Sequence, residues 1–387
     1  MNESFDARPG CQARRRWRGS GSEGSVAGGR SRRTRRWLAA LSIAGAVLAG
    51  LGGSGCGSTA PAQERRSQLP ADSSVPTAEP AVLHLRAFAT TAAVNRPLPA
   101  DPALDPRSAA IASALNAGEH NADYLADGTT VFDAAAGDRV SRIVCTDDRR
   151  ERCPLAGVQV SVNERWKPSP GSDRSMVVID YPAHKAYDLW HVATGPGGTV
   201  ALSADSSIRV GWGDMTALGG SGKSPGATGS GLSHLFGMIR VHEAWSAVND
   251  GGCHTRSRCA LASAIPHALH VATSATCRSF RSPAVTSDGT GNGSSCVPEG
   301  AHLFLDAKAN CAFDPAEPIE EAVCFALQRY GAFVTDTGGS RFAVGFEGAS
   351  AGEPGGSGPS PYKAGGLKWD YYDMSAIPWR YLEVTAH

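Results

Sequence analysis

The spacing of the cysteines constrains the fold of this chain more than any other sequence feature. Eight of its ten cysteines lie in four close pairs along the sequence, with 7, 5, 18 and 12 residues between the two members of the successive pairs. The pairs are Cys145 and Cys153, Cys253 and Cys259, Cys277 and Cys296, and Cys311 and Cys324. An even set of cysteines in an exported chain favours disulfides, and the lack of a C-x2-C knuckle argues against zinc. We therefore expect four disulfides between neighbours, each closing a short loop, and no metal.

The N-terminal region is typical of an export signal. Residues 30–36 (RSRRTRR) are cationic, and residues 37–51 form an apolar stretch rich in alanine and glycine. A membrane-spanning helix needs about 20 apolar residues, so a signal peptide is favoured over a retained anchor. The paired arginines resemble a twin-arginine signal, although Leu38 stands where such signals usually carry Phe.

A lipidation motif follows the apolar stretch. Residues 51–58 (LGGSGCGS) resemble a bacterial lipoprotein box in which Cys56 would carry the lipid, although Gly53 departs from the usual aliphatic residue. Simple secretion is the alternative. Residues 57–80 are rich in Pro, Ser and Ala without periodicity, the composition of a flexible tether. The expected organisation is an export signal over 1–56, a disordered tether over 57–80 and one disulfide-stapled β-rich domain over 81–387.

The charge distribution argues against two classes of partner. Residues 1–56 hold ten arginines against three acids, whereas residues 57–387 hold 27 basic and 34 acidic residues. A net acidic domain disfavours nucleic acid, because phosphate binding needs a basic face. Residues 217–224 (ALGGSGKS) match a loose phosphate-binding loop, but Pro225 and Gly226 follow where its helix must begin. We expect neither nucleotide nor any other cofactor.

Runs of β-branched and aromatic residues dominate the second half of the chain. Four runs between residues 176 and 214, separated by turn residues, predict an antiparallel meander, and further strands are expected at 301–306, 332–336 and 342–346. Residues 318–330 predict a helix, with Pro at its first turn, Glu320 and Glu321 near its N-terminus, and Gly331 after it. A shorter helix is expected from 106 to 116, capped by Asp105. The fold class is therefore mainly β, an antiparallel sandwich or barrel-like domain with a few short packed helices.

Several side chains are candidates for acid/base chemistry or binding. His267 and His270 are three residues apart and could act as general bases or ligands on a helix, but would point to opposite faces of a strand. His242 and Glu243 begin like a zincin motif, but Ser246 replaces the second histidine. Paired carboxylates would suit glycoside chemistry, and exposed tryptophans would stack on sugars, although strand tryptophans are more often core. The carboxylates considered are Asp180, Asp188, Asp214, Asp288, Glu299 and Asp306.

A series of short blocks resembles a widespread group of secreted bacterial proteins, commonest in actinobacteria and of unassigned function. The blocks are NRPLP (95–99), LDPRSA (104–109), DRSMVV (173–178), YDLW (187–190), GAT (226–228), GL (231–232), PHAL (266–269), SPA (282–284), SDG (287–289), PEGA (298–301), ALQRYG (326–331) and IPW (377–379). The resemblance covers about residues 95–383. It places His267 and Asp288 first among the candidate site residues, because the group carries the same residues there. His234 and Ser287 depart from the group's pattern, and the cysteine pairs are additions of this chain.

We expect an extracytoplasmic glycan-active hydrolase or lyase. Its acid/base candidates are His267, Asp288, Asp180 and Asp188, and its sugar platforms are Trp190 and Trp212. The alternative is a non-catalytic carbohydrate-binding or structural domain of the cell envelope. An enzyme needs His267 and a carboxylate in one concave pocket, whereas a binding module would present a flat aromatic strip. The expected partners are a polysaccharide and, through the lipid anchor alone, the membrane.

Overall fold

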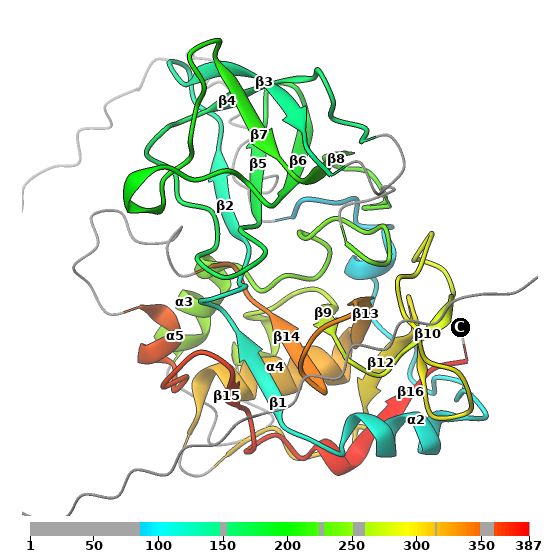
Figure 1. Cartoon of the computed structure of the whole chain (residues 1–387). Helices are drawn as coiled ribbons and strands as arrows, with labels where there is room; N and C mark the ends of the chain where they lie inside the picture. Colours follow the sequence, from blue (N-terminus) through cyan, green and yellow to red (C-terminus); the bar gives the residue numbers. More distant parts are fainter. Residues whose placement is uncertain are drawn as a thin grey trace, which may run out of the picture. The chain divides into compact units, whose positions relative to one another are not determined.

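The computed structural model describes residues 86–147, 153–223, 228–250, 260–313, 316–348 and 360–386. This part of the chain contains sixteen strands in four sheets and four short α-helices (Figure 1). The predicted mainly β fold is confirmed, but the sheets mix parallel with antiparallel pairs. The expected export signal, Cys56, the tether and the Cys253–Cys259 pair lie outside the described residues.

The largest sheet has seven strands and brings together distant parts of the sequence. Its order is β15 (Tyr372–Asp373), β1 (His120–Asp123), β14 (Phe342–Gly345), β9 (Leu269–Ala272), β13 (Ala332–Asp336), β12 (His302–Leu305) and β16 (Leu382–Val384). The pairs β1–β14 and β9–β13 are parallel, and the other pairs are antiparallel. An early strand therefore lies beside a late one.

One face of this sheet packs against the helices, and the other faces the candidate site. Because strand side chains alternate, Phe342 and Val344 of β14 join the core formed with the helices, whereas Ala343 and Gly345 point to the opposite face, where they line a cavity. The helices are α2 (Ser108–Leu115), α3 (Val241–Asp250), α4 (Pro318–Arg329) and α5 (Pro361–Ala364). None of the helices in the described ranges is long and apolar enough to cross a membrane.

Two smaller sheets, drawn in cyan-green and green in Figure 1, share one apolar core. They are the four-stranded sheet β2 (Thr130–Asp133), β5 (Met176–Asp180), β6 (Lys185–Trp190) and β8 (Trp212–Ala217), and the three-stranded sheet β4 (Gln159–Val162), β3 (Arg139–Cys145) and β7 (Ser207–Val210). Strand β5 serves two cores. Met176 and Val178 pack toward the three-stranded sheet, whereas Val177 and Ile179 join a cluster that includes Phe333 of β13. The apolar run of β5 is continuous because both of its faces are buried.

Three of the expected disulfides are confirmed. The S–S distances are 2.06 Å for Cys145–Cys153, 2.07 Å for Cys277–Cys296 and 2.00 Å for Cys311–Cys324. The second closes the loop between the paired strands β10 (Thr276–Phe280) and β11 (Val297–Glu299). The third ties the chain after β12 to helix α4. The bridges therefore fasten local loops, while long-range strand pairing makes the sheets.

The predicted helix at 318–330 is confirmed as α4. Its Pro and the two acids Glu320 and Glu321 lie in the first turn, as expected, and both acids are buried. Each carboxylate accepts a backbone N–H, from Ala376 at 2.9 Å for Glu320 and from Phe313 at 2.8 Å for Glu321. These bonds compensate for the loss of water around the two acids. The shorter predicted helix is α2, and Asp105 accepts the N–H of Arg107 just before it at 2.7 Å.

Candidate active site

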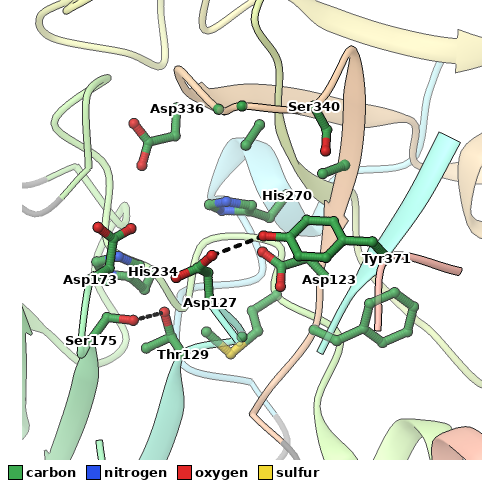
Figure 2. Close-up of a pocket in the computed structure, with 18 of the residues that line it drawn as sticks. Asp123, Asp127, Thr129, Asp173, Ser175, His234, His270, Asp336, Ser340 and Tyr371 are labelled. Atoms are coloured by element: carbon green, nitrogen blue, oxygen red, sulfur yellow. Dashed lines mark hydrogen bonds between the residues drawn. The ribbon is translucent and has the colours of Figure 1, made fainter. Parts of the chain in front are cut away.

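A polar cavity of about 540 Å³ lies over the face of the seven-stranded sheet that the helices leave uncovered (Figure 2). The sheet contributes residues of β1, β9, β13 and β14, and the segments that precede β2, β5, α3, β14 and β15 contribute the remaining wall. The titratable groups that line it are Asp123, Asp127, Asp173, Asp336, His234, His270 and Tyr371. The described residues that line it include no Lys or Arg, so with its four aspartates ionised the cavity is negatively charged even when both histidines are protonated.

A row of three residues forms the floor of the cavity. Strand pairing places Asp123 of β1 beside Gly345 of β14, and His270 of β9 lies on the other side of Gly345. A Cβ on residue 345 would lie 2.6 Å from Cδ2 of His270, closer than side chains tolerate. Glycine at this position therefore leaves the space between the carboxyl group and the imidazole open.

His234 and Asp188 form a hydrogen-bonded pair in the wall. Nδ1 of His234 lies 3.0 Å from Oδ1 of Asp188, and the backbone N–H of His234 donates to the same oxygen at 2.9 Å. Ser233 Oγ donates to the second oxygen at 2.8 Å. Asp188 is 1% exposed and points away from its neighbours Tyr187 and Leu189, which lie in the core of the smaller sheets. Because a carboxylate only accepts, the Nδ1 atom of His234 carries a proton.

The remaining nitrogen of His234, Nε2, is the one that the contact with Asp188 leaves available. No hydrogen bond joins it to another described residue, and His234 lines the cavity. Burial alone would lower the pKa of His234, but the hydrogen bond and charge of Asp188 outweigh it and raise the pKa, with Asp336 and Asp173 adding to the effect. A histidine held by a buried carboxylate is a common arrangement for proton transfer.

Asp123 is the carboxyl group whose pKa is shifted furthest within the cavity. Burial, followed by the charges of Asp370 and Asp127, raises its pKa to about 7. Its Oδ1 is buried and accepts no hydrogen bond from the described residues. Nearby, Tyr371 Oη donates to Oδ2 of Asp127 at 2.9 Å (Figure 2). Asp123 can therefore gain or lose a proton near neutral pH.

His270 differs from His234 in its protonation. Thr335 Oγ1 lies 2.9 Å from its Nδ1 atom. Burial, and then the charge of His234, lower the pKa of His270 to about 3. His270 is therefore neutral near pH 7, and it can offer a hydrogen bond, but no charge, to a ligand in the cavity.

His267, the first sequence candidate, does not lie in this cavity. It lines a separate hollow of about 30 Å³. Its Nδ1 atom lies 2.8 Å from the carbonyl oxygen of Ala268, and its Nε2 atom lies 3.0 and 3.1 Å from the two carboxylate oxygens of Glu243. Both ring nitrogens are thus engaged, and His267 and Glu243 are 8% and 2% exposed. The structure therefore places His267 in a buried pair with Glu243, away from the polar cavity, and its expected catalytic role stays a prediction.

The three candidate aspartates have separate positions. Asp188 belongs to the site as the partner of His234. Asp180 lies at the turn after β5, where its Oδ1 accepts the N–H of Ala183 at 2.9 Å. Asp288 lies beside Glu299 and Asp336, and not beside His267. The expected convergence of His267 and Asp288 on one rim is therefore not found.

The two proposed sugar platforms pack against protein. Trp212 is 7% exposed and lies in the core of the smaller sheets. Trp190 is opposite it in the β6–β8 pairing and stacks on His191 with ring centres 3.5 Å apart. The structure thus places Trp212 in the core, the more frequent position of a strand tryptophan, and its expected role as a sugar platform stays a prediction.

Comparison with known proteins gives no relative from which a role could be transferred. No protein-family model matches the chain, and no curated protein or solved structure is detectably similar to it. The resemblance to the secreted actinobacterial group remains a prediction.

Sequence reasoning missed His234, Asp123 and Asp336 as site residues. His234 stood out as a departure from the resembling group, and it follows the glycine-containing segment 226–231, but neither feature identifies a partner. A polar residue that interrupts an apolar strand was the signal available for Asp188, which was a candidate. Its pairing with a loop histidine depends on the folding of β6 against that loop.

Proposed function

We propose that the protein is an exported glycan-active enzyme, a hydrolase or lyase, whose active site is the cavity over the seven-stranded sheet. The observation that carries this proposal is the buried Asp188–His234 pair, whose free ring nitrogen belongs to a cavity that also contains Asp123, with a pKa of about 7. Two proton-transfer groups in one polar cavity are the minimum that glycosidic bond cleavage needs.

The shifted pKa values assign the two roles. The raised pKa of His234 favours its protonated form, which donates the Nε2 proton to the departing sugar oxygen. Asp123 in its ionised form takes a proton from water, and the water oxygen then attacks the anomeric carbon. The bond between that carbon and the leaving oxygen breaks with both electrons on the oxygen, which receives the proton of His234. Asp188 holds the imidazole and stabilises its charge.

The charge of the cavity favours a class of substrate. Four aspartates and several hydroxyl groups line it, and none of the described lining residues is Lys or Arg. Carboxylates accept hydrogen bonds from sugar hydroxyl groups and repel anions. Neutral or amino sugars therefore suit the cavity better than uronates, and this preference favours hydrolysis over elimination, which acts on uronates.

An exposed aromatic pair supports the alternative, a carbohydrate-binding domain without catalysis. Trp369 is 58% exposed and packs edge-on against Tyr372, with ring centres 4.9 Å apart. An exposed indole is a suitable platform for a sugar ring. Trp369 replaces Trp190 and Trp212 as the residue on which this alternative depends.

The cellular location is part of the same proposal. Three disulfides are typical of proteins outside the reducing cytosol. Lipidation of Cys56 and the tether over 57–80 would then hold the domain at the outer side of the membrane.

The proposal is tested with the purified chain on a panel of neutral, amino-sugar and uronate polysaccharides. Reducing-end release measures hydrolysis, and absorbance of unsaturated products measures elimination. Turnover that depends on His234 supports the enzyme. Retention on one polysaccharide without turnover, abolished by Trp369→Ala but not by His234→Ala, would instead establish the binding domain.

A further inference from the structure

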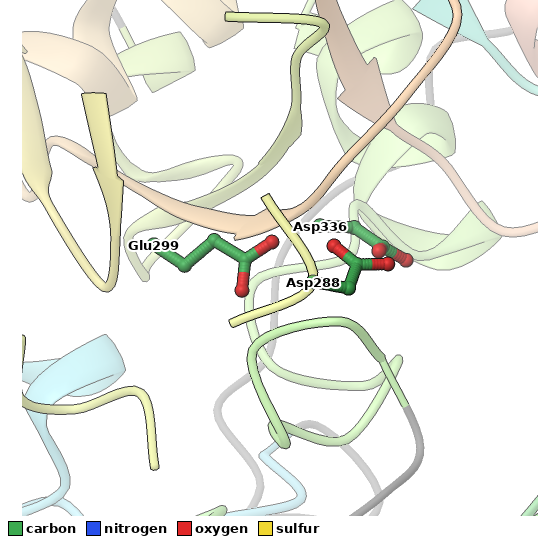
Figure 3. Close-up of side chains that lie close together, drawn as sticks. All are labelled: Asp288, Glu299 and Asp336. Atoms are coloured by element: carbon green, nitrogen blue, oxygen red, sulfur yellow. The ribbon is translucent and has the colours of Figure 1, made fainter. Parts of the chain in front are cut away.

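Three carboxyl groups converge at the edge of the cavity. One oxygen each from Asp288, Glu299 and Asp336 lies within 4.8 Å of the other two. Figure 3 shows the Glu299 carboxyl group pointing toward the two aspartates. Glu299 ends β11, Asp336 ends β13, and Asp288 lies in the loop between β10 and β11. Asp336 also lines the cavity, so the cluster and the candidate active site share one residue.

Glu299 is the member that protein contacts alone do not explain. It is 0% exposed, yet its Oε2 atom has no hydrogen-bond partner among the described residues. Its other oxygen, Oε1, accepts from Thr337 Oγ1 at 3.3 Å. An unsatisfied buried carboxylate oxygen is costly, and this one faces two further carboxylates.

Within the described ranges, no Lys, Arg or His forms an ion pair with Asp288, Glu299 or Asp336. A cation between the three groups would offset the repulsion between their negative charges.

The backbone of Gly229 shapes the cluster from one side. Its N–H donates to Oδ1 of Asp336 at 3.0 Å. A Cβ at this position would lie 2.5 Å from Oδ1 of Asp288 and 2.7 Å from Oδ1 of Asp336. Any larger residue would push the two carboxylates out of their present positions.

We propose that Asp288, Glu299 and Asp336 form a binding site for Ca²⁺. All the proposed ligand atoms are carboxylate oxygens, which hard cations prefer, and Ca²⁺ accepts several oxygen ligands in flexible geometry. Asp288 is exposed, so water completes the coordination from that side. Zn²⁺ is a poorer fit because the cluster contains no Cys or His. The inference does not rest on the proposed enzymatic function, since its readout is cation binding.

The test is cation binding by the full chain after treatment with EDTA and removal of the chelator. Calorimetric titration with CaCl2 and thermal melting with and without CaCl2 are compared for wild type, Glu299→Gln and Asp288→Asn. Glu164→Gln is the matched control, since Glu164 is exposed and forms no contact described above. MgCl2 in place of CaCl2 tests selectivity, because Mg²⁺ demands stricter octahedral geometry.

Wild type and Glu164→Gln should bind one Ca²⁺ and melt at a higher temperature when it is present, with weaker binding of Mg²⁺. Glu299→Gln and Asp288→Asn should bind at least about tenfold more weakly, because affinity depends on the number of charged ligands. Without calcium, Glu299→Gln should be at least as stable as wild type, because it removes one of the repelling charges. The proposal is overturned if wild type binds no Ca²⁺ at millimolar concentration, or if Asp288→Asn, at an exposed position with little risk to folding, binds like wild type.

Discussion

Asp188 and His234 are 46 residues apart in the sequence, and their side chains meet at 3.0 Å between Oδ1 and Nδ1. The Asp188 carboxylate fixes the imidazole ring of His234 through Nδ1, and Nε2 remains available to a ligand in the cavity. His234→Ala should therefore reduce turnover at least about a hundredfold, the usual scale of a lost general acid or base. His184→Asn is the control, since His184 lies exposed in the β5–β6 turn with a positive φ that Asn tolerates. Equal turnover of the two variants would contradict the assignment of His234.

The pH dependence of turnover should be bell-shaped. Activity rises with pH through about 7 as Asp123 ionises, and it falls as His234 loses its proton above its raised pKa. Asp188→Asn removes the charge that raises the pKa of His234, so the alkaline limb should move to lower pH. The groups that face His234 are Asp188, Asp336, Asp173 and His270, and those that face Asp123 are Asp370, Asp127 and Asp173.

The profile is measured as kcat/KM on the substrate that the panel identifies, because this ratio reports the free enzyme. An alkaline limb that stays in place in Asp188→Asn would show that another group donates the proton.

His267→Ala should lower stability and leave the turnover of the folded protein nearly unchanged. The substitution leaves Glu243 buried without its partner, and breaking such a pair typically costs about 3–5 kcal/mol. Burial opposes the shift, but Glu243 raises the pKa of His267 above its ordinary value of 6.5. The stabilisation is therefore full below pH 6.5 and is lost as pH rises through the raised pKa. Arg86, Arg240 and His242 also act on this pair.

Thermal melting of wild type and His267→Ala across pH measures this effect. The difference in melting temperature between the two proteins should shrink at alkaline pH. A folded variant that has lost turnover would instead return His267 to the catalytic residues.

Removing a disulfide should reduce stability, and the loss should be larger for the bridge that closes the longer loop. The Cys277–Cys296 bridge spans 19 residues and the Cys145–Cys153 bridge spans 8. Loop entropy gives a stabilisation of about 3 kcal/mol for the longer loop and about 2.5 kcal/mol for the shorter one. Paired Cys→Ser variants are compared by chemical denaturation. Peptide mapping without reductant should also recover the predicted 253–259 bridge. Free thiols at these two positions would contradict the prediction that neighbouring cysteines pair.

Cys56→Ser should abolish membrane anchoring in a bacterial host. Without the lipidated cysteine, the protein should appear in the medium or remain unprocessed. Cys11→Ser is the control, because Cys11 lies in the part expected to be cleaved. Fractionation followed by immunoblotting measures the distribution, and an unchanged membrane fraction in Cys56→Ser would refute the lipoprotein prediction.

Local features of the fold could be predicted from the sequence. Helix α4 follows from Pro318, the two acids after it and Gly331, and the bridges follow from cysteines that are neighbours. The antiparallel pairing of β5, β6 and β8 follows from apolar runs separated by turns, but β7, which lies between β6 and β8 in the sequence, pairs in parallel with β3 in the other sheet. In each case the partners lie close together in the sequence, so loop closure limits the choices.

The parallel pairs and the site could not be predicted in this way. The pairing of β1 with β14 joins residues near 120 to residues near 342, and no pattern in either strand specifies the other. The same limitation concealed the pairing of Asp188 with His234. For His267, the sequence carried a plausible catalytic histidine, but it contained no sign that Glu243 and a carbonyl group would occupy both nitrogens.

The position of β14 between β1 and β9 has a consequence for the order of synthesis. Strand β1 leaves the ribosome early, yet its neighbour in the sheet contains Gly345, close to the end of the chain. The floor of the cavity is therefore complete only after residue 345 has emerged. A chain truncated before β14 lacks the strand that lies between Asp123 and His270, so it cannot form this floor.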